Sequence, residues 1–390
     1  MQKISADYIF TGNAAPIKNG VVILHEDGSI IAIVNPNENP ISLDDVQKFN
    51  GIICPGFINA HCHLELSYLK NQISKKTTLP GFVKELVQKR FNFSEEEMLQ
   101  AAVDAEQEMF QNGIVAVGDI ANGNSTFELK AKQKLHYHTF LEIFEIDEQK
   151  AEATFNKANK LKASYFNPEQ ISIVPHAPYS VSKKLMALIA RQNNLIASIH
   201  SQETPSENDF FTNKSGVLYE QMAAFNPNVA TWEKIAQGAL HHFIPFFKNA
   251  KALLLVHNTF ANEKDIDFVT HQPIAAYWCC CPKANLFIEN TLPDFTLFNN
   301  KNLEVVIGTD SLASNDKLCI LDELKTISNH AEIPLETILK WGTFNGAKAL
   351  NILHQYGSLE KGKKPGINLL KNIDLTHLKL TDNTTVQKLY

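Results

Sequence analysis

Eight short apolar segments, most of them separated by stretches with a helical pattern, constrain the fold of this 390-residue chain more than any other feature. The segments read IICPGFINA, IVAVGDI, YHTFLEIF, ISIVPH, LIASIH, ALLLVH, PIAAYWCC and LEVVIGTD. One helical stretch, SEEEMLQAAVDAEQEMFQ, begins with Ser94 and Glu97 at the spacing of a capping box. Alternating strands and helices predict an α/β fold with a parallel sheet, and eight such units over about 290 residues fit a closed (β/α)8 TIM barrel. A doubly wound sheet is the structural alternative.

The two ends of the chain differ from this middle part. The first 50 residues carry the strand-like runs ADYIFTG and GVVILHEDGSIIAIV, broken by Gly, Asn and Pro, and GSLEKGKKPGINLL near the other end reads as turns with a short strand.

Composition excludes several classes of protein. The formal net charge is −6 and no Lys/Arg cluster occurs, so we expect no nucleic-acid partner. No apolar run approaches the roughly 20 residues that span a bilayer, and MQKISADYIF lacks the pattern of a secretory signal, so we expect no membrane association. None of the six cysteines forms a CxxC pair, which predicts reduced thiols in a cytoplasmic protein.

Polar side chains stand at the ends of five of the eight segments. In a (β/α)8 barrel the active site lies at the carboxyl ends of the strands. A single histidine at such a position is usually a core residue, but five strands that end this way predict a site. The residues are His61, His63, His176, His200, His257 and Asp310.

The first of these strand ends predicts a metal site. His61 and His63 are two residues apart, so both imidazoles project to one face of a strand and can chelate. A third histidine and a carboxylate would complete a mixed nitrogen and oxygen site suited to zinc or ferrous iron. The segment ISIVPHAPYS has no lysine to bridge a second ion, so we expect one metal.

Three other groups of possible ligands are interpreted as structural. His136 and His138 also form an HxH pair, but they begin the third segment and belong to the opposite end of the barrel. The pair HH at 241–242 lies in a long connection and is expected to be surface or loop structure. The triplet at 279–281 puts adjacent thiols on opposite faces of a strand, which favours buried, inert cysteines.

The motifs PGFINAHCHLELS, HAPYSVS, HSQE, LVHNT, CPKANL and GTDSLASN occur in this order along nearly the whole chain. Together they resemble the amidohydrolase superfamily in its cytosine-deaminase-like branch. The resemblance implies a small β-sandwich formed by both chain ends, residues 1–54 and 346–390, beside a barrel over residues 55–345. Ile367-Asn368 departs from the usual Ala-Asp of the returning strand, Cys62 stands where many relatives have Thr, and Lys283-Ala284 departs from the family pattern near the pocket.

The resemblance also implies roles for individual residues. The ligands of one divalent ion, zinc or ferrous iron, would be His61, His63, His200 and Asp310. Asp310 would also take a proton from water, His257 would stand beside that water, and Glu203 would shuttle protons to the leaving amine. The alternative for Glu203 is an ordinary loop carboxylate. The expected substrate-binding residues are His176, Glu65, Ser311 and Asn315.

The segments HCHLELS, HAPYSV, GTDSLASN and ILDELK most resemble the aminofutalosine deaminases, and deaminases of S-adenosylhomocysteine or methylthioadenosine almost as well. Both act on the 6-amino group of adenine. The alternatives are hydrolysis of a cyclic amide or a triazine, and a non-catalytic barrel that binds a ligand. Residues 64–90 and 204–248 are expected to cover the site, with most of their aromatic rings packing the lid. We expect a small-molecule substrate and consider a homodimer possible.

Overall fold

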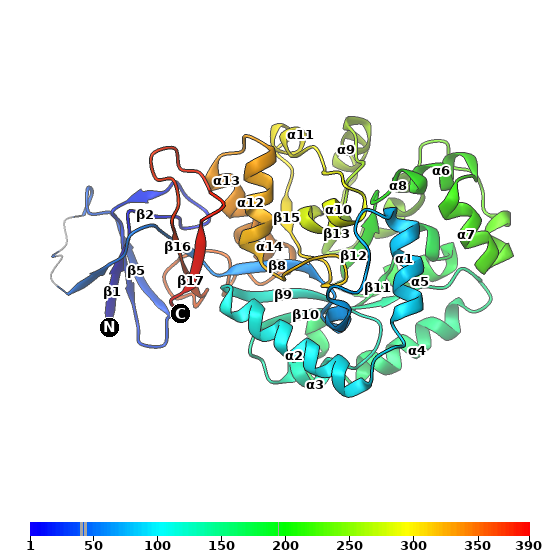
Figure 1. The fold of residues 1–390 in the computed structure, drawn as a ribbon, viewed down its shortest axis with the longest axis horizontal. Coiled ribbons are helices and arrows are strands. Elements are labelled where there is room, and N and C mark those ends of the chain that lie inside the picture. The colour runs from blue at the N-terminus through cyan, green and yellow to red at the C-terminus, as the bar shows by residue number, and fades with distance from the viewer. Residues whose placement is uncertain (40–41, 43–44, 194) are drawn as a thin grey trace.

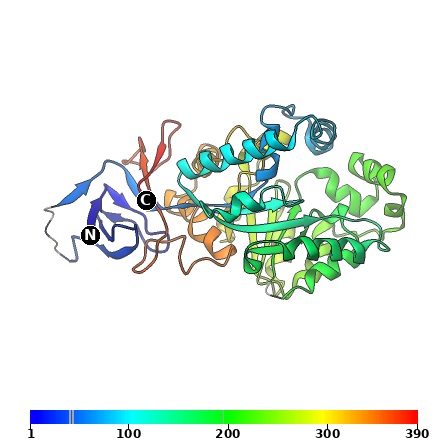
Figure 2. The same ribbon diagram turned by 90° about the horizontal axis from the view of Figure 1, so that it is seen from below.

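The computed structural model describes residues 1–39, 42, 45–193 and 195–390. The chain folds into a small unit of strands at one end and a larger unit of strands and helices at the other, and both termini lie in the small unit (Figure 1). Figure 2 shows the same separation from a perpendicular direction. None of the helices in the described ranges is long and apolar enough to cross a membrane.

The small unit contains two sheets, one with strand order β5-β4-β1-β6 and one with order β17-β16-β7-β2-β3. Asn368 near the end of the chain pairs antiparallel with Cys54, so the last segment returns to the first. Ile4 and Val22 of the first sheet share an apolar core with Ile9 and Leu369 of the second. The strands are β1 Gln2–Ser5, β2 Tyr8–Ile9, β3 Ile17–Lys18, β4 Val21–Leu24, β5 Ile30–Val34, β6 Val46–Lys48, β7 Ile52–Pro55, β16 Ile367–Lys371 and β17 Thr385–Lys388.

The larger unit contains two parallel four-stranded sheets with orders β8-β9-β10-β11 and β12-β13-β14-β15. This α/β arrangement confirms the prediction from alternating segments. The first predicted segment splits in two, because β7 belongs to the small unit and β8 begins the larger one. The strands are β8 Phe57–Cys62, β9 Ile114–Ala121, β10 His136–Ile143, β11 Ile171–Pro175, β12 Ile196–Ser201, β13 Ala252–His257, β14 Ala276–Cys280 and β15 Val305–Ile307.

Backbone hydrogen bonds join the outer strands of these two sheets at both edges. The amide of His200 at the end of β12 donates to the carbonyl of His176 just after β11, at 2.9 Å. On the other edge the amides of Thr309 and Asp310 donate to the carbonyl of His61 in β8, at 2.9 and 3.1 Å. The ends of β8, β11, β12 and β15 therefore lie next to one another.

Helices surround the strands of the larger unit (Figure 1). The α2 helix begins with the predicted capping box, in which Ser94 and Glu97 exchange hydrogen bonds. The helices are α1 Thr78–Lys89, α2 Glu95–Gln111, α3 Phe127–Ala131, α4 Ala151–Ala163, α5 Lys183–Ala190, α6 Pro205–Asn213, α7 Val217–Phe225, α8 Ala239–Phe243, α9 Glu263–Thr270, α10 Pro282–Ile288, α11 Phe295–Asn300, α12 Ile320–His330, α13 Leu335–Trp341 and α14 Phe344–Ala349, with 3-10 turns η1 Leu64–Leu69, η2 Pro168–Gln170, η3 Pro178–Ser180, η4 Pro227–Thr231 and η5 Ile244–Phe247.

Alternate residues of the parallel strands pack into two separate cores, as the period of a strand requires. Leu254 and Cys279 belong to a core among the strands, whereas Leu255 and Cys280 belong to the core beneath the helices. All six cysteines are buried and free, so the prediction of buried thiols without disulfides is confirmed. The cytoplasmic location remains a prediction.

Candidate metal centre and active site

His61 and His63 meet at the end of β8. A shift in the register between β8 and β9 occurs between Asn59 and Cys62, and there the strand carries both imidazoles to one side. Their Nε2 atoms are 3.2 Å apart. Asn59 anchors this strand end to β15, because its side-chain amide donates to Thr309 Oγ1 at 2.8 Å. The two imidazoles therefore lie together at the end of the strand, as their spacing predicted.

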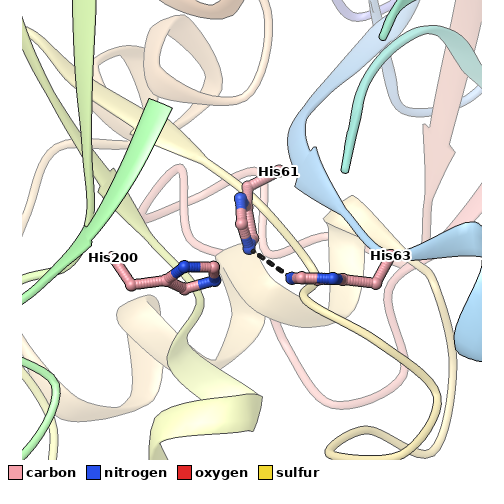
Figure 3. Close-up of side chains that lie close together, drawn as sticks. All are labelled: His61, His63 and His200. Carbon is pink, nitrogen blue, oxygen red and sulfur yellow. Dashed lines mark hydrogen bonds between the residues drawn. The ribbon is translucent and has the colours of Figure 1, made fainter. Parts of the chain in front are cut away.

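His200 and Asp310 complete the cluster from neighbouring strands. His200 directs its Nδ1 to the carbonyl oxygen of His176 at 2.8 Å, so Nδ1 carries the hydrogen and Nε2 keeps its lone pair. Asp310 follows β15 with a φ of 56°, and its Oδ1 lies 3.4 Å from His63 Nε2 and 3.6 Å from His61 Nε2. Ser314 donates a hydrogen bond to the other carboxylate oxygen of Asp310. Figure 3 shows the rings of His61, His63 and His200 converging.

The protonation states of these groups suit a divalent cation. Burial lowers the pKa of His61 to about 4 and that of His63 to about 3. Burial raises the pKa of Asp310, but the neighbouring His61, His63 and His257 together hold it well below its usual range. Neutral imidazoles and a carboxylate are the forms in which these side chains bind metals.

The donor atoms form overlapping groups, each compact enough to hold an ion. Ligand atoms of His61, His63 and His200 fall within 4.8 Å of one another, and so do those of His61, His257 and Asp310. Among the ion pairs of the described residues, none joins Asp310 to a lysine or an arginine that would occupy the centre. A set of three imidazoles and one carboxylate is a mixed nitrogen and oxygen donor set, which fits zinc or ferrous iron.

Glu203 and His257 face each other beside this cluster. The chain turns after β12 through Gln202, whose φ is 51°, and Glu203 Oε1 then lies 3.5 Å from His257 Nε2. The other ring nitrogen of His257 is 3.0 Å from Asn285 Oδ1, which accepts its hydrogen. Burial raises the pKa of Glu203 to about 8 and lowers the pKa of His257. Glu203 can therefore hold and release a proton near neutral pH.

The four residues predicted to bind substrate lie in different settings. His176 Nδ1 is 2.8 Å from Ser180 Oγ, and its ring centroid lies 5.0 Å from that of His200. Glu65 accepts a hydrogen bond from the amide of Asn122 at 3.0 Å. Ser311 is buried, with its Oγ 3.4 Å from Ser314 Oγ. The side-chain amide of Asn315 donates to Thr309 O at 2.9 Å and Glu323 Oε1 at 2.7 Å, so it braces the turn behind Asp310. Their roles toward a substrate remain predictions.

Sequence reasoning missed several residues that orient this site. Glu142 near the end of β10 places its Oε1 3.4 Å from His200 Nδ1, and Asn122 Nδ2 donates to its Oε2 at 3.0 Å. The sequence signal for Glu142 is its place near the end of the segment YHTFLEIF, the same kind of position that the histidines occupy. Asn285 and Ser314, which hold His257 and Asp310, carry no comparable pattern in the sequence.

A buried ion pair supports the turn that follows His63. Lys130 Nζ lies 2.5 Å from Asp119 Oδ2, and both side chains are inaccessible to solvent. Asp119 Oδ1 accepts a hydrogen bond from the amide of Leu64 at 2.8 Å. Lys130 also donates to Thr139 Oγ1 at 3.2 Å. The pair therefore links β9, β10 and α3 to the residue directly after the histidine pair.

Substitution of Lys130 by methionine is expected to lower the free energy of unfolding by about 3–5 kcal/mol, because it leaves the Asp119 carboxylate buried without its cation. Urea unfolding followed by circular dichroism measures the change. Lys70→Met is the matched control, since Lys70 pairs with Glu108 at 3.7 Å on the partly exposed surface and should cost less than about 1 kcal/mol. Equal losses in the two variants would show that the buried pair has no special role.

The second HxH pair lies away from the cluster. His136 begins β10, with its ring 5.4 Å from that of Tyr356, and His138 Nε2 is 3.0 Å from Ser172 Oγ. Neither belongs to a potential metal-binding group of the described residues. The expectation for residues 241–242 is corrected in one respect: they form part of α8, and His242 is buried with its ring stacked on Trp232.

Replacing His136 and His138 singly by alanine is therefore expected to leave the bound metal per chain unchanged. The reason is that their strand begins at the opposite end from the cluster of His61 and His200. Metal analysis of each purified, folded variant after zinc loading tests this. Loss of stoichiometric metal from a folded variant would contradict the assigned direction of β10.

Aromatic residues of the segments that follow β8 and β12 pack mainly on one another. Phe210 contacts Phe211, Tyr219 and Trp232 with ring centroids 4.9, 5.6 and 5.9 Å apart. Phe82 of α1 belongs to the same buried cluster. These contacts agree with the expectation that most of these rings pack the lid.

Comparisons with known proteins identify deaminases that are similar to this chain in sequence or in fold. The chain is 27% identical to an adenosine deaminase of Helicobacter pylori over 334 residues, which cover 82% of this chain and 79% of that one. Its fold matches the H. pylori aminofutalosine deaminase in complex with methylthio-coformycin, with a TM-score of 0.81 and 24% identity over 98% and 94% of the two chains. A zinc-bound adenosine deaminase of Xanthomonas campestris matches with a TM-score of 0.73 and 19% identity over 95% and 84% of the chains.

The model of the Amidohydrolase family matches residues 52–389, which include every residue of the cluster. The chain therefore belongs to the amidohydrolase family and is a hydrolase that acts on carbon–nitrogen bonds.

Proposed function

We propose that this amidohydrolase is a metal-dependent deaminase that releases ammonia from the 6-amino group of an adenine nucleoside derivative. The observation that carries the proposal is the pairing of Glu203 with His257, 3.5 Å apart, beside the convergent donors of His61, His63, His200 and Asp310. The H. pylori relatives, described as deaminases of adenosine and aminofutalosine, support the same substrate class.

We infer one divalent ion, zinc or ferrous iron, held by His61, His63, His200 and Asp310. The chemistry that such an ion supplies when bound is Lewis acidity, which lowers the pKa of a water molecule. The zinc in the X. campestris adenosine deaminase supports zinc as the first ion to test.

The protein's own residues then move the protons. Hydrolytic deamination joins the water oxygen to carbon 6 of the purine and breaks the bond from that carbon to the amino nitrogen. Asp310 accepts a proton from the water, and His257, fixed by Asn285, orients the water. Glu203 delivers a proton to the ring nitrogen next to carbon 6. Of the two water protons, one ends on the ring nitrogen and the other leaves with the amino group as ammonia.

The fold of the larger unit is inferred to be a closed (β/α)8 barrel, because backbone hydrogen bonds join its two parallel sheets at both edges. We further propose a barrel domain over residues 55–345 and a small β-sandwich domain formed by residues 1–54 and 346–390. The proposed boundary between residues 345 and 346 falls inside the α14 helix. Ala347 of this helix packs with the core among the strands of the larger unit. A homodimer remains a prediction.

Aminofutalosine is the preferred substrate, and S-adenosylhomocysteine or methylthioadenosine is the second candidate. Hydrolysis of a cyclic amide or a triazine is the alternative reaction, and a non-catalytic barrel is disfavoured because the sequence keeps every expected ligand and Glu203. The test is ammonia release by the zinc-loaded or iron-loaded enzyme on a panel of adenine nucleosides, a cyclic amide and a triazine. Turnover of only the last two compounds would overturn the proposal.

A further inference from the structure

A second buried glutamate lies directly behind the proposed proton shuttle. Glu207 occupies the first turn of α6 and is completely buried. Both of its carboxylate oxygens accept a hydrogen bond from the amide of Gln202, at 3.0 and 3.1 Å. Among the described residues no lysine, arginine or histidine lies within ion-pair distance of Glu207, so backbone amides are the partners that the structure gives it.

The amide that Glu207 holds belongs to the residue that turns the chain. Gln202 has a φ of 51°, a left-handed conformation that is unfavourable for a residue other than glycine. Consecutive backbone amides around such a residue form a concave site for a hydrogen-bond acceptor, and here the side-chain carboxyl of Glu207 fills that site. Burial raises the pKa of Glu207 to about 8, and the amides of Gln202 and Glu203 oppose this rise by hydrogen bonding to the carboxyl group.

The same turn is attached to the segment that follows His257. The carbonyl of Gln202 accepts a hydrogen bond from the amide of Phe260 at 3.1 Å, and its side-chain amide donates to Asp265 Oδ2 at 2.8 Å. The carbonyl of Ser201 accepts from the amide of Asn258 at 2.9 Å. The position of Glu203 relative to His257 is therefore set through the backbone of Gln202.

The geometry points to Glu207 as a positioning residue for Glu203. Its carboxylate holds the left-handed turn at Gln202, and this turn aims Glu203 at the ring of His257. Glu207 lies in the first turn of α6, the start of the segment that covers the site, so it ties the placement of that segment to the placement of the shuttle. This inference rests on the proposed role of Glu203 as the proton shuttle.

A double-mutant cycle of Glu207→Gln and Glu203→Gln tests it, with zinc-loaded enzyme and the adenine nucleoside that the wild type deaminates fastest. Glu207→Gln alone should lower kcat by about 10-fold to 100-fold, the scale of a misplacement near 1 Å, with KM and metal content nearly unchanged. The double variant should lose no more than Glu203→Gln alone, because Glu207 acts only through Glu203. If Glu207 only stabilised the fold, the two substitutions would act independently. Their separate fold-losses in kcat would then multiply in the double variant.

Glu220→Gln is the matched control, since Glu220 is exposed in the first turn of the neighbouring α7 helix, and its kcat should stay within about twofold of wild type. Thermal unfolding of each variant separates loss of fold from loss of placement, and Glu207→Asp replaces Glu207→Gln in the cycle if the latter does not fold. Wild-type kcat in the Glu207 variant would overturn the positioning role alone, and so would losses that multiply in the double variant while Glu203→Gln shows its expected loss of activity. Near-native kcat in Glu203→Gln would overturn both this role and the proposed shuttle.

Discussion

Replacement of Glu203 by glutamine is expected to lower the rate of ammonia release by at least about 100-fold, the lower end of what general acid–base groups contribute. Glutamine keeps the size of the side chain and can still form a hydrogen bond to His257, 3.5 Å away, but it cannot carry a proton. The metal content should stay at the wild-type value, because Glu203 is not among the proposed ligands. Steady-state ammonia release and metal analysis on the same samples measure both quantities.

The control for this experiment is Glu233→Gln. Glu233 lies on the surface, paired with Lys183 at 3.0 Å and with 82% of its side chain exposed, so its removal should not change turnover. Near-native turnover of Glu203→Gln on the best substrate would contradict the shuttle role. Hydrolysis of a cyclic amide or a triazine would then become the stronger interpretation.

Replacement of His200 by alanine is expected to abolish both stoichiometric metal binding and turnover. The substitution removes one of three imidazoles whose donor atoms lie within 4.8 Å of one another, and it opens a cavity at the end of β12. Metal that binds only the folded state stabilises it, so added zinc should raise the unfolding temperature of metal-free wild type and leave that of the variant unchanged. This shift provides a measurement that does not depend on activity.

His136→Ala and His138→Ala in β10 are the controls for this result, because each removes an imidazole ring far from the cluster. Removal of either of those rings should preserve the zinc-induced shift. If His200→Ala retains a full equivalent of zinc and the same shift, then His200 is not a ligand. The third nitrogen donor would in that case have to come from His257, which lies beside Asp310.

Much of the candidate site could be predicted because its residues follow simple rules of position. Side chains alternate along a strand, so His61 and His63 had to face one direction, and parallel strands bring their carboxyl ends together. Those two facts are enough to group His200, His257 and Asp310 with the first pair. Glu203 was different, because it follows a left-handed turn that no periodicity describes, and only the resemblance of HSQE to a family motif identified it.

The sequence by itself therefore determined the α/β alternation, the buried free cysteines and the histidine and aspartate cluster at the strand ends. Only the tertiary structure decided what orients that cluster. Asn59 meets Thr309 across 250 positions, Asn285 meets His257 across 28, and Glu142 meets His200 from another strand. A strand's period is a local property that each segment carries in its own residues. The hydrogen-bond partner of a buried polar group depends on which distant segments pack against it, and this is known only once the whole chain has folded.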